Sequence, residues 1–338
     1  MAVVPYDAIL LLSFGGPEGP DDVIPFLENV LRGRNVPRER MLEVAEHYYH
    51  FGGRSPINDH NRALLRVLDA ELKVHGPSLQ LYWGNRNWHP LIEDTVRQMT
   101  ADGVRHALVF ATSAFSSYSA CRQYVEDLER ARAAAGPDAP QLDKLRLFFN
   151  HPGFIEPMIE RVDHALRQFS NDRRAAVRLV FSAHSVPLAM AERSHYLAQL
   201  AEASRLVGEG AGHPEWTLVY QSRSGPPSQP WLEPDILDHL RTLAAEGAKD
   251  VVLCPIGFVS DHMEVLYDLD YEAAHLAQDL GLHLVRTGTV GVHPRFVTMI
   301  RELIAERVSG ADRLVVGAMA PPPDVCPADC CPPPMRRA

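Results

Sequence analysis

Short apolar runs rich in Val, Leu and Ile alternate along this chain with longer segments in which apolar residues recur at helical spacing. This alternation is typical of βα units built around a mainly parallel sheet. The apolar runs predict strands over residues 7–14, 79–84, 106–112, 178–182, 216–221, 251–258 and 283–287. The periodic segments predict helices over residues 21–31, 58–74, 91–99, 119–134, 155–169, 196–207, 234–245, 263–280 and 294–308. We therefore expect an α/β fold with parallel sheets flanked by helices.

A breaker cluster at residues 136–140, Gly-Pro-Asp-Ala-Pro, interrupts this alternation near the middle of the chain. It predicts two α/β units, an N-terminal one over residues 1–150 and a C-terminal one over residues 151–292. The last helix, at about residues 293–309, is expected to return and complete the N-terminal unit. Residues 318–338 form a separate tail rich in Pro and Cys.

Composition narrows the class of protein further. Of the 338 residues 46% are hydrophobic, which excludes a disordered chain. The formal net charge is −10, so binding to nucleic acid is not expected. No apolar run approaches the ~20 residues that span a bilayer, and the N-terminus lacks the pattern of a secretory signal. We expect a cytoplasmic monomer with no nucleic-acid partner and no transmembrane segment.

Several common cofactor motifs are missing from the sequence. Gly15-Gly16-Pro17 follows the first predicted strand without the spacing of a dinucleotide fingerprint, and no Gly-Lys-Ser/Thr phosphate loop is present. There is also no His-Glu-x-x-His and no paired Cys-x-x-Cys. Nucleotide chemistry and a closed structural zinc site are therefore not expected. Open α/β sheets bind ligands at the carboxyl ends of their strands, where the candidate residues should lie.

Two sets of titratable residues occur at such positions. His184 follows the strand predicted over 178–182, where a neutral imidazole can serve as a base or metal ligand, or simply cap the next turn. Glu264, Asp268 and Glu272 recur at i, i+4 and i+8 and form one acidic stripe on the predicted helix. Such a stripe suits a divalent cation or proton transfer. The alternative is a solvated face with acids favoured in the first turn.

Arginines lie next to aromatic residues in several of the predicted loops. These segments are residues 32–34, 48–58, 83–88 and 220–234. Arg matches the geometry of a carboxylate through paired hydrogen bonds, and aromatic side chains suit a flat ring. Together the segments predict a site for an aromatic polycarboxylate, although surface charge and core packing explain each one alone.

Five segments together resemble the ferrochelatases, enzymes that insert ferrous iron into a porphyrin. They are LSFGGP at 12–17, FGGRSPIN at 51–58, FSAHSVP at 181–187, QSRSGP at 221–226 and PIGFVSDHME at 255–264. The resemblance spans about residues 6–308, and its details are similar to the actinobacterial branch, which acts on coproporphyrin III. It implies two Rossmann-like domains of the chelatase type, with the porphyrin between them.

The resemblance also implies an activity and roles for particular residues. The expected enzyme is a lyase of haem biosynthesis that converts coproporphyrin III to coproheme, with Fe2+ as a substrate. His184 matches the family's active-site histidine and proton acceptor, and Glu264 matches its partner carboxylate. Asp268 and Glu272 match the acidic line behind it, so these four residues are the expected metal ligands. The residues expected to bind the porphyrin are Phe14, Arg32, Arg34, Tyr48, Arg54, Ser55, Tyr118 and Trp231.

Other functions stay open at this point. The substrate could be protoporphyrin IX, or the chain could be a porphyrin or iron carrier without turnover. A cobalt chelatase acting on a corrin precursor is a related alternative. If the family role holds, transient contacts with neighbouring enzymes of the haem pathway are also expected.

One position in the first motif departs from some coproporphyrin-using relatives. Those relatives carry a Tyr where this chain has Phe14, and that Tyr can ligate the product iron. Phe14 offers no oxygen, so Tyr48 and Tyr49 stay open as substitutes.

The tail is a second departure. Several relatives hold a [2Fe-2S] cluster with three C-terminal cysteines and one internal cysteine, and four thiolates are the usual requirement. Cys326, Cys330 and Cys331 supply three, and Cys121 is a better candidate for the fourth than Cys254 in its predicted strand. A flexible tail of reduced thiols and an adventitious zinc site are the alternatives. Because the tail is rich in proline, we expect it to bury little surface.

Overall fold

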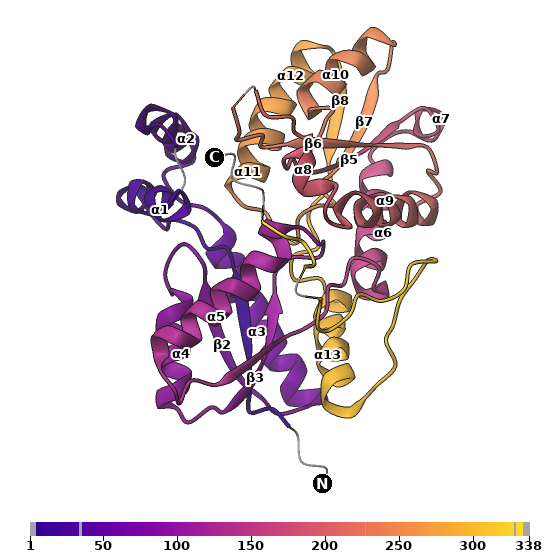
Figure 1. Cartoon of the computed structure of the whole chain (residues 1–338). Helices are drawn as coiled ribbons and strands as arrows, with labels where there is room; N and C mark the ends of the chain where they lie inside the picture. The colour runs from indigo at the N-terminus through magenta and orange to yellow at the C-terminus, as the bar shows by residue number, and fades with distance from the viewer. Residues whose placement is uncertain (1–4, 34–35, 227, 328, 334–338) are drawn as a thin grey trace.

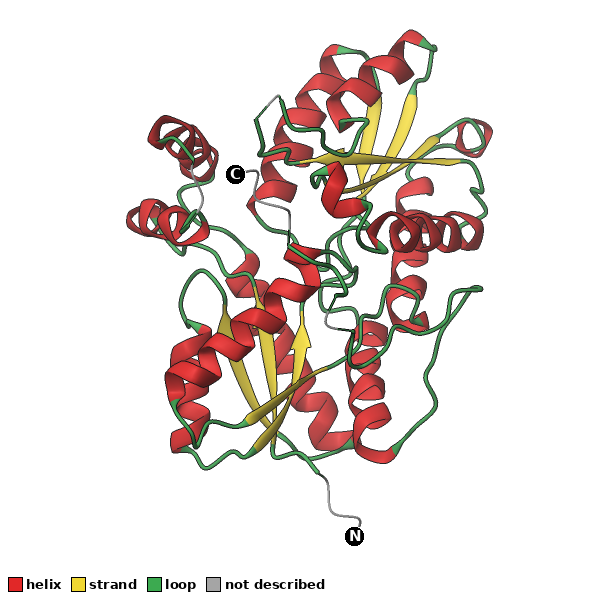
Figure 2. Ribbon diagram, in the orientation of Figure 1, coloured by secondary structure: helices red, strands yellow, loops and turns green. Residues whose placement is uncertain are grey.

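The computed structural model describes residues 5–33, 36–226, 228–327 and 329–333 (Figure 1). It contains two four-stranded parallel sheets, each flanked by helices (Figure 2). The strand order is β2-β1-β3-β4 in the first sheet and β6-β5-β7-β8 in the second. The predicted α/β class is confirmed. The same order occurs twice, although the sequence shows no long repeat.

The strands of both sheets are short, as is usual for βα units. They are β1 (Ala8–Ser13), β2 (Gln80–Asn85), β3 (His106–Ala111), β4 (Gln141–Lys144), β5 (Arg178–His184), β6 (Trp216–Gln221), β7 (Asp250–Cys254) and β8 (His283–Arg286). The central strands β1 and β7 are buried along their whole length, which explains why their sequences are continuous apolar runs.

Helices connect the strands and cover both faces of each sheet. The α-helices are α1 (Val23–Val30), α2 (Arg38–His50), α3 (Ile57–His75), α4 (Ile92–Ala101), α5 (Gln123–Ala135), α6 (Pro152–Leu166), α7 (Asn171–Arg174), α8 (Leu188–Ala191), α9 (Tyr196–Gly210), α10 (Ile236–Ala245), α11 (Met263–Val265), α12 (Ala274–Asp279) and α13 (Pro294–Ser309). A 3-10 turn, η1 (Pro20–Asp22), and two π-helical segments, η2 (Tyr118–Arg122) and η3 (Leu266–Ala273), complete the set. No helix within the described part of the chain combines the length and apolarity that crossing a bilayer requires.

One large hydrophobic core joins the two sheets. It contains Ile9 and Phe110 from the first sheet together with Phe181 and Val252 from the second. Helix α13 packs against both α3 and α6, so the last helix contacts both halves of the chain. Separate cores lie between the first sheet and α4–α5, and between the second sheet and the helices α10, η3 and α12. The domain boundaries near residues 150 and 292 stay predictions.

The described residues include four elements that the pattern did not indicate, namely α2, β4 and the single-turn helices α7 and α8. Helix α2 lies beside α1, where Met41 and Ala45 pack against Phe26 in a small core of their own. Strand β4 is a polar edge strand, Gln-Leu-Asp-Lys, without the apolar run of the other strands. The predicted helix over 263–280 is also divided, because its middle third is the π-helix η3.

The C-terminal tail buries little, as predicted: among its described residues only Pro322 and Cys331 are buried, although polar contacts hold it to the folded body. The backbone N–H of Val316 donates to Asn150 O at 2.8 Å, and Asn150 Nδ2 donates to Met319 O at 2.8 Å. Cys331 is only 3% exposed. Polar side chains of the folded body therefore satisfy the backbone of the tail, which supplies little apolar surface of its own.

A buried ion pair anchors the start of this tail. Arg146 and Glu306 are 1% and 2% exposed and form a bidentate pair, with Nε–Oε2 at 2.7 Å and Nη2–Oε1 at 2.8 Å. Arg146 Nη2 also donates to Leu314 O at 3.0 Å.

We expect Glu306→Gln to lower the free energy of unfolding by about 3–5 kcal/mol, because it leaves the Arg146 charge buried without its partner. Urea denaturation measures this loss. The double variant Arg146→Met with Glu306→Leu should recover most of it, and a loss below about 1 kcal/mol in the single variant would show that the pair is not an anchor.

Candidate active site

His184 is the last residue of β5, a central strand of the second sheet, and it pairs in register with Gln221 at the end of β6. The ring Nδ1 lies against Ser185 O, so Nδ1 carries the hydrogen. The Tyr196 hydroxyl donates to His184 O at 3.0 Å and fixes the backbone. These contacts aim Nε2 away from the strand, where it lies 3.6 Å from Glu264 Oε1.

Glu264 sits in the first turn of the helix that follows β7. His262 begins this helix as its N-cap, and its Nδ1 accepts a hydrogen bond from Val265 N–H at 3.3 Å. The proton of a neutral His262 is therefore on Nε2, which lies 3.8 Å from Glu264 Oε2. The carboxylate of Glu264 thus stands between two imidazoles. His262 has no role predicted from the sequence, although its place two residues before Glu264 in the fifth motif is a signal for one.

The charges of this group shift its proton affinities strongly. Burial by itself lowers the pKa of His184, but the Glu264 carboxylate more than offsets this and raises it to about 9. Burial opposes ionisation of Glu264 as well, yet His184 holds its pKa at about 2. Burial lowers the pKa of His262. In the resting protein at neutral pH, His184 is consequently protonated, Glu264 is ionised and His262 is neutral.

Asp268 lies behind this pair on the π-helix η3. Ser222 Oγ donates to Asp268 Oδ2, and Gln221 Nε2 donates both to the same oxygen at 3.3 Å and to Glu264 O at 3.1 Å. Ser222 has a backbone φ of +62°, a left-handed conformation that is unusual for a residue with a side chain. Burial raises the pKa of Asp268 to about 7, with Glu264 and Glu272 adding repulsion against the hydrogen bond from Ser222.

The predicted acidic stripe runs from a short α-helical turn into a π-helix rather than along one α-helix. Glu264, Asp268 and Glu272 follow one another from α11 into η3, and burial raises the pKa of Glu272 as well. Short π-segments are rare and occur frequently at functional sites. The carboxylates of the stripe differ in proton affinity. Glu264 is ionised at neutral pH, whereas the pKa of Asp268 is about 7.

Helix α2 brings the first half of the chain to this group. The His47 ring stacks on Tyr267 of η3, with centroids 3.6 Å apart and planes at 5°, and His50 lies 4.3 Å from Tyr271. Burial raises the pKa of Tyr48, and the charges of Glu264 and Asp268 raise it further. The Tyr48 phenol is thus held near the acidic residues of the other half.

The remaining residues expected at a porphyrin site lie at the strand ends and around α1 and α2. Phe14 follows β1 and is 37% exposed, and its ring lies 6.3 Å from Phe26, which in turn lies 5.7 Å from Tyr48. Ser55 is buried and its N–H donates to Pro17 O at 2.9 Å. The Tyr118 hydroxyl donates to Glu126 at 3.0 Å.

Two of the three cationic candidates, Arg32 and Arg54, contact neighbours from their own half. Arg32 contacts Asn29, and Arg54 forms a 2.5 Å ion pair with Asp59. Arg34 lies outside the described residues. Trp231 forms an isolated antiparallel β-bridge with Pro187, and its indole N–H is buried with no hydrogen-bond partner among the described residues. An arginine without an assigned role, Arg86, lies under Phe14 at 6.0 Å and is held by the buried carboxylate of Asp127.

Four cysteines gather at the other face of η2. Hydrogen-bonding contacts join Cys121 to Cys326 and Cys326 to Cys330, and the sulfurs of Cys330 and Cys331 are 3.6 Å apart. The contact with Cys326, aided by Lys144 and Arg122, lowers the pKa of Cys121. Burial raises the pKa of Cys331. The four cysteine side chains therefore lie close to one another.

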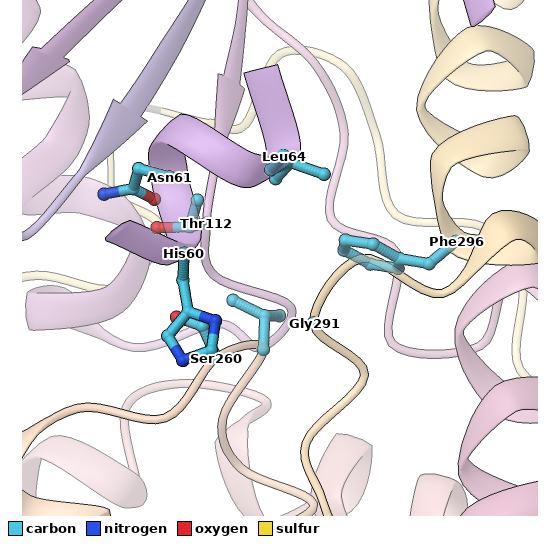
Figure 3. A pocket seen from close by; sticks show the side chains of 8 residues that line it. His60, Asn61, Leu64, Thr112, Ser260, Gly291 and Phe296 are labelled. Carbon is cyan, nitrogen blue, oxygen red and sulfur yellow. The ribbon is translucent and has the colours of Figure 1, made fainter. Parts of the chain in front are cut away.

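A small cavity lies where the two halves meet, with room for about one water molecule (Figure 3). It is lined by His60 and Asn61 of α3, by Thr112 after β3, and by Ser260 and Gly291 from the second half. Asn61 Nδ2 lies beside it and is buried with no hydrogen-bond partner in the part of the chain that the structure describes. Since the cavity includes neither His184 nor Glu264, it belongs to the junction rather than to the charged group.

Within the described ranges, no three His, Cys, Asp or Glu side chains converge on one point in the way that a self-sufficient metal site requires. His184 and Glu264 form a pair, and solvent reaches both side chains, which are 33% and 46% exposed. Two protein side chains can hold a cation briefly and transfer it to a bound ligand that supplies the remaining donor atoms.

Comparison with known proteins gives a consistent result. Residues 6–308 match the family model described as Ferrochelatase. A protein of Rhodopirellula baltica named ferrochelatase is 54% identical over 97% of this chain and 93% of its own length. One of Streptomyces griseus named coproporphyrin III ferrochelatase is 51% identical over 97% of this chain and 94% of its own length.

Among solved structures, SirB from Bacillus subtilis with Fe3+ is similar, with a TM-score of 0.56 at 14% identity, covering 89% of this chain and 97% of that one. This likeness concerns the fold alone. It agrees with the two parallel sheets described above.

The charges of the site make a direct prediction about His184. An NMR titration of its ring should give a pKa of about 9, and Glu264→Gln should lower this pKa, because it removes the largest contribution that opposes burial. A His184 that titrates below pH 7 in the unaltered chain would contradict the ion pair.

The same shifts set how stability depends on pH. The pKa of His184 is raised on folding, so the pair stabilises the fold fully below about pH 6.5 and this contribution is lost as the pH rises through about 9. The pKa of Glu264 is lowered, so the contribution is also lost as the pH falls from about 4.5 through about 2. Thermal unfolding of Glu264→Gln should lack both changes.

Proposed function

This chain belongs to the ferrochelatase family, and on that premise we propose that it inserts ferrous iron into coproporphyrin III to give coproheme, a step of haem biosynthesis. Family membership makes it a lyase that places a metal in a porphyrin. The observation that carries the finer proposal is the ion pair of His184 and Glu264 at the strand ends, together with relatives named for coproporphyrin III.

Iron insertion has a fixed proton balance. A free porphyrin carries two N–H protons in the plane of its ring, and both must leave as Fe2+ takes their place among the four nitrogens. A site that binds the bent ring more tightly than the flat ring lowers the barrier, because the bent ring exposes its nitrogens. A base near the ring must then accept at least one of the two protons.

His184 is protonated at rest and cannot accept a proton until it loses this one. We assign the change to the arrival of iron, because a divalent cation at Glu264 cancels the negative charge that raises the pKa of His184. The imidazole then releases its proton toward Asp268, whose pKa of about 7 suits a transient acceptor. The neutral His184 next accepts a pyrrole proton while Fe2+ enters the ring.

Glu264 and Asp268 also suit the cation itself, because carboxylate oxygens are common ligands of divalent metals. Glu272 continues this row on η3, and we propose that the three carboxylates guide iron toward His184. In the product the porphyrin ring supplies four nitrogen ligands. The protein therefore needs to supply only two ligands while the iron is being transferred to the ring.

The porphyrin would lie between the two halves, against the aromatic residues Phe14, Tyr48 and Trp231. Ser55 and Tyr118 add hydroxyls, and Arg32, Arg34 and Arg54 are the proposed partners of the propionates. Coproporphyrin III carries more carboxylates than protoporphyrin IX, which suits an arginine-rich entrance. Tyr48, held near Glu264, is the favoured oxygen in place of the phenol that Phe14 lacks.

We also propose a [2Fe-2S] cluster on Cys121, Cys326, Cys330 and Cys331. A two-iron cluster needs two thiolates on each iron rather than three ligands on one point, and the four sulfurs stand as two neighbouring pairs. The cluster would tie the tail to η2 and supply a redox-active group. The described cysteines are all free, which suits a reducing cytoplasm.

Enzyme assays test the substrate. Under anaerobic conditions the purified protein should insert Fe2+ into coproporphyrin III faster than into protoporphyrin IX, followed by the absorbance of each porphyrin. His184→Ala should lower kcat by about 100-fold or more while porphyrin binding changes little, because a general base contributes about 10²–10⁴ to the rate. A preference for protoporphyrin IX would overturn the substrate, and tight binding of both porphyrins without turnover would favour a carrier.

Metal and sulfide analysis tests the cluster. Protein purified without oxygen should be brown and contain about two irons and two sulfides per chain. Cys121→Ser should lose both, whereas Cys254→Ala, at a buried cysteine inside β7, should keep them. Colourless, iron-free protein would leave the tail as reduced thiols.

A further inference from the structure

Arg286, the last residue of β8, holds two carboxylates at once. Its Nε and Nη2 donate to Asp270 Oδ1 and Oδ2 at 2.7 and 2.6 Å. Its Nη1 donates to Asp261 Oδ1 and Oδ2 at 3.3 and 3.2 Å, and to Thr287 O at 3.2 Å. Thr289 Oγ1 donates to Asp261 at 3.0 Å and completes the arrangement. Nε and Nη2 of the guanidinium therefore bind the Asp270 carboxylate side by side, while Nη1 binds the Asp261 carboxylate.

The two carboxylates flank the segment that carries the charged group. Asp261 immediately precedes His262, the N-cap of α11, and Asp270 lies in η3 two residues after Asp268. Arg286 thus holds the chain on both sides of the stretch from His262 to Asp268. The clamp, as we call Arg286 with Asp261 and Asp270, is anchored in turn by the sheet, because β8 pairs with β7.

Burial makes this clamp stiff. Arg286 is 17% exposed, and its partners Asp261 and Asp270 are 21% and 33% exposed. Charge-assisted hydrogen bonds with bidentate geometry are both stronger and more directional than single ones. Among the described residues, none of the hydrogen bonds of this arrangement reaches His184 or Glu264, so it acts on them through the backbone.

A π-helix needs such a constraint. Its hydrogen bonds run from i to i+5, and the form is rare outside single turns, so an unrestrained segment can return to α-helical spacing. A change of one residue in register would turn the side chains by about 100° around the axis. Asp268 and Asp270 are two residues apart and therefore point in different directions. Holding Asp270 on the sheet side keeps Asp268 directed at Ser222 and Gln221.

We propose that Arg286 is a positioning residue for metal insertion, which holds Glu264 and Asp268 in place opposite His184 through its two-carboxylate clamp. This inference rests on the proposed function and adds a residue that touches neither metal nor porphyrin. Lys cannot replace Arg here, because an ammonium is a point charge that cannot form the planar fork and reach a second carboxylate.

Arg295 provides a matched control. It also bridges two carboxylates, with Nε–Glu156 at 2.9 Å and Nη1–Glu302 at 2.8 Å, and it is 26% exposed. It lies in α13, far from α11 (Figure 1). Arg286→Lys and Arg295→Lys therefore remove similar interactions, one beside the charged group and one away from it.

The test compares both variants with the unaltered chain in coproporphyrin binding, followed by fluorescence quenching, and in Fe2+ insertion. We expect kcat/KM for Fe2+ to fall by about 10–100-fold in Arg286→Lys, the range seen when residues that orient metal ligands are changed. The Kd for coproporphyrin should stay within about twofold, and Arg295→Lys should keep its activity. Equal activity in the two variants, or a loss of porphyrin binding that matches the loss of activity, would overturn the proposal.

Two further measurements apply if Arg286→Lys does not fold or if the proposed function itself is wrong. If Arg286→Lys does not fold, Asp270→Asn opens one arm of the clamp, and it should show the same selective loss. If the unaltered chain inserts no iron into either porphyrin, the proposed function fails. The positioning role is then tested by Co2+ binding to the porphyrin-free protein. Arg286→Lys should weaken this binding by about tenfold, and unchanged binding would contradict the role.

Discussion

The imidazolium of His184 and the carboxylate of Glu264 lie 3.6 Å apart, and both side chains are partly exposed. Because packing around the side chains does not hold this distance, the backbone that carries each residue must be rigid. His184 ends β5 and Glu264 begins the helix after β7, and these strands are hydrogen-bonded neighbours in one parallel sheet. Parallel βα units place the carboxyl ends of all strands at one edge, which is where open α/β sheets bind ligands. The order of the second sheet is thus the constraint on which the charged group depends.

The first half of the chain serves the same group from the opposite side. Its sheet repeats the strand order of the second, and α2 extends to η3 through the stacked rings of His47 and Tyr267. A shared core and α13 fix the two halves to one another. The site combines rigid strand ends with a π-helix, and proton affinity along the acidic row rises from Glu264 to Asp268. Protons and cations therefore compete for the same carboxylates, which is what an exchange of two protons for one metal requires.

Much of this arrangement can be predicted from the sequence, for a physical reason. Strands buried on both faces, such as β1 and β7, are continuous apolar runs, so the parallel α/β class and the placement of His184 after a strand follow directly. The spacing of Glu264, Asp268 and Glu272 predicts that they share one side of a helix. The sequence pattern does not predict strand β4, because this edge strand has only four residues, three of them polar, and so lacks an apolar run.

Other features depend on contacts that no local pattern contains. Helix α2 is stabilised by α1 and by rings on η3, and the π-form of η3 depends on which carbonyls its N–H groups reach. The tail was expected to bury little because of its prolines. It does bury little, and the contacts that hold it come from polar groups such as Asn150 that lie far away in the sequence.

The most direct test of the account is to count the protons released when Co2+ binds the porphyrin-free protein at pH 7.5 in weakly buffered solution with an indicator dye. Because His184 is protonated at rest and loses its proton when a cation reaches Glu264, about one proton should appear per cation bound. His184→Ala should release far fewer protons while still binding the cation. Binding without proton release in the unaltered chain would contradict the exchange of proton for metal at this pair.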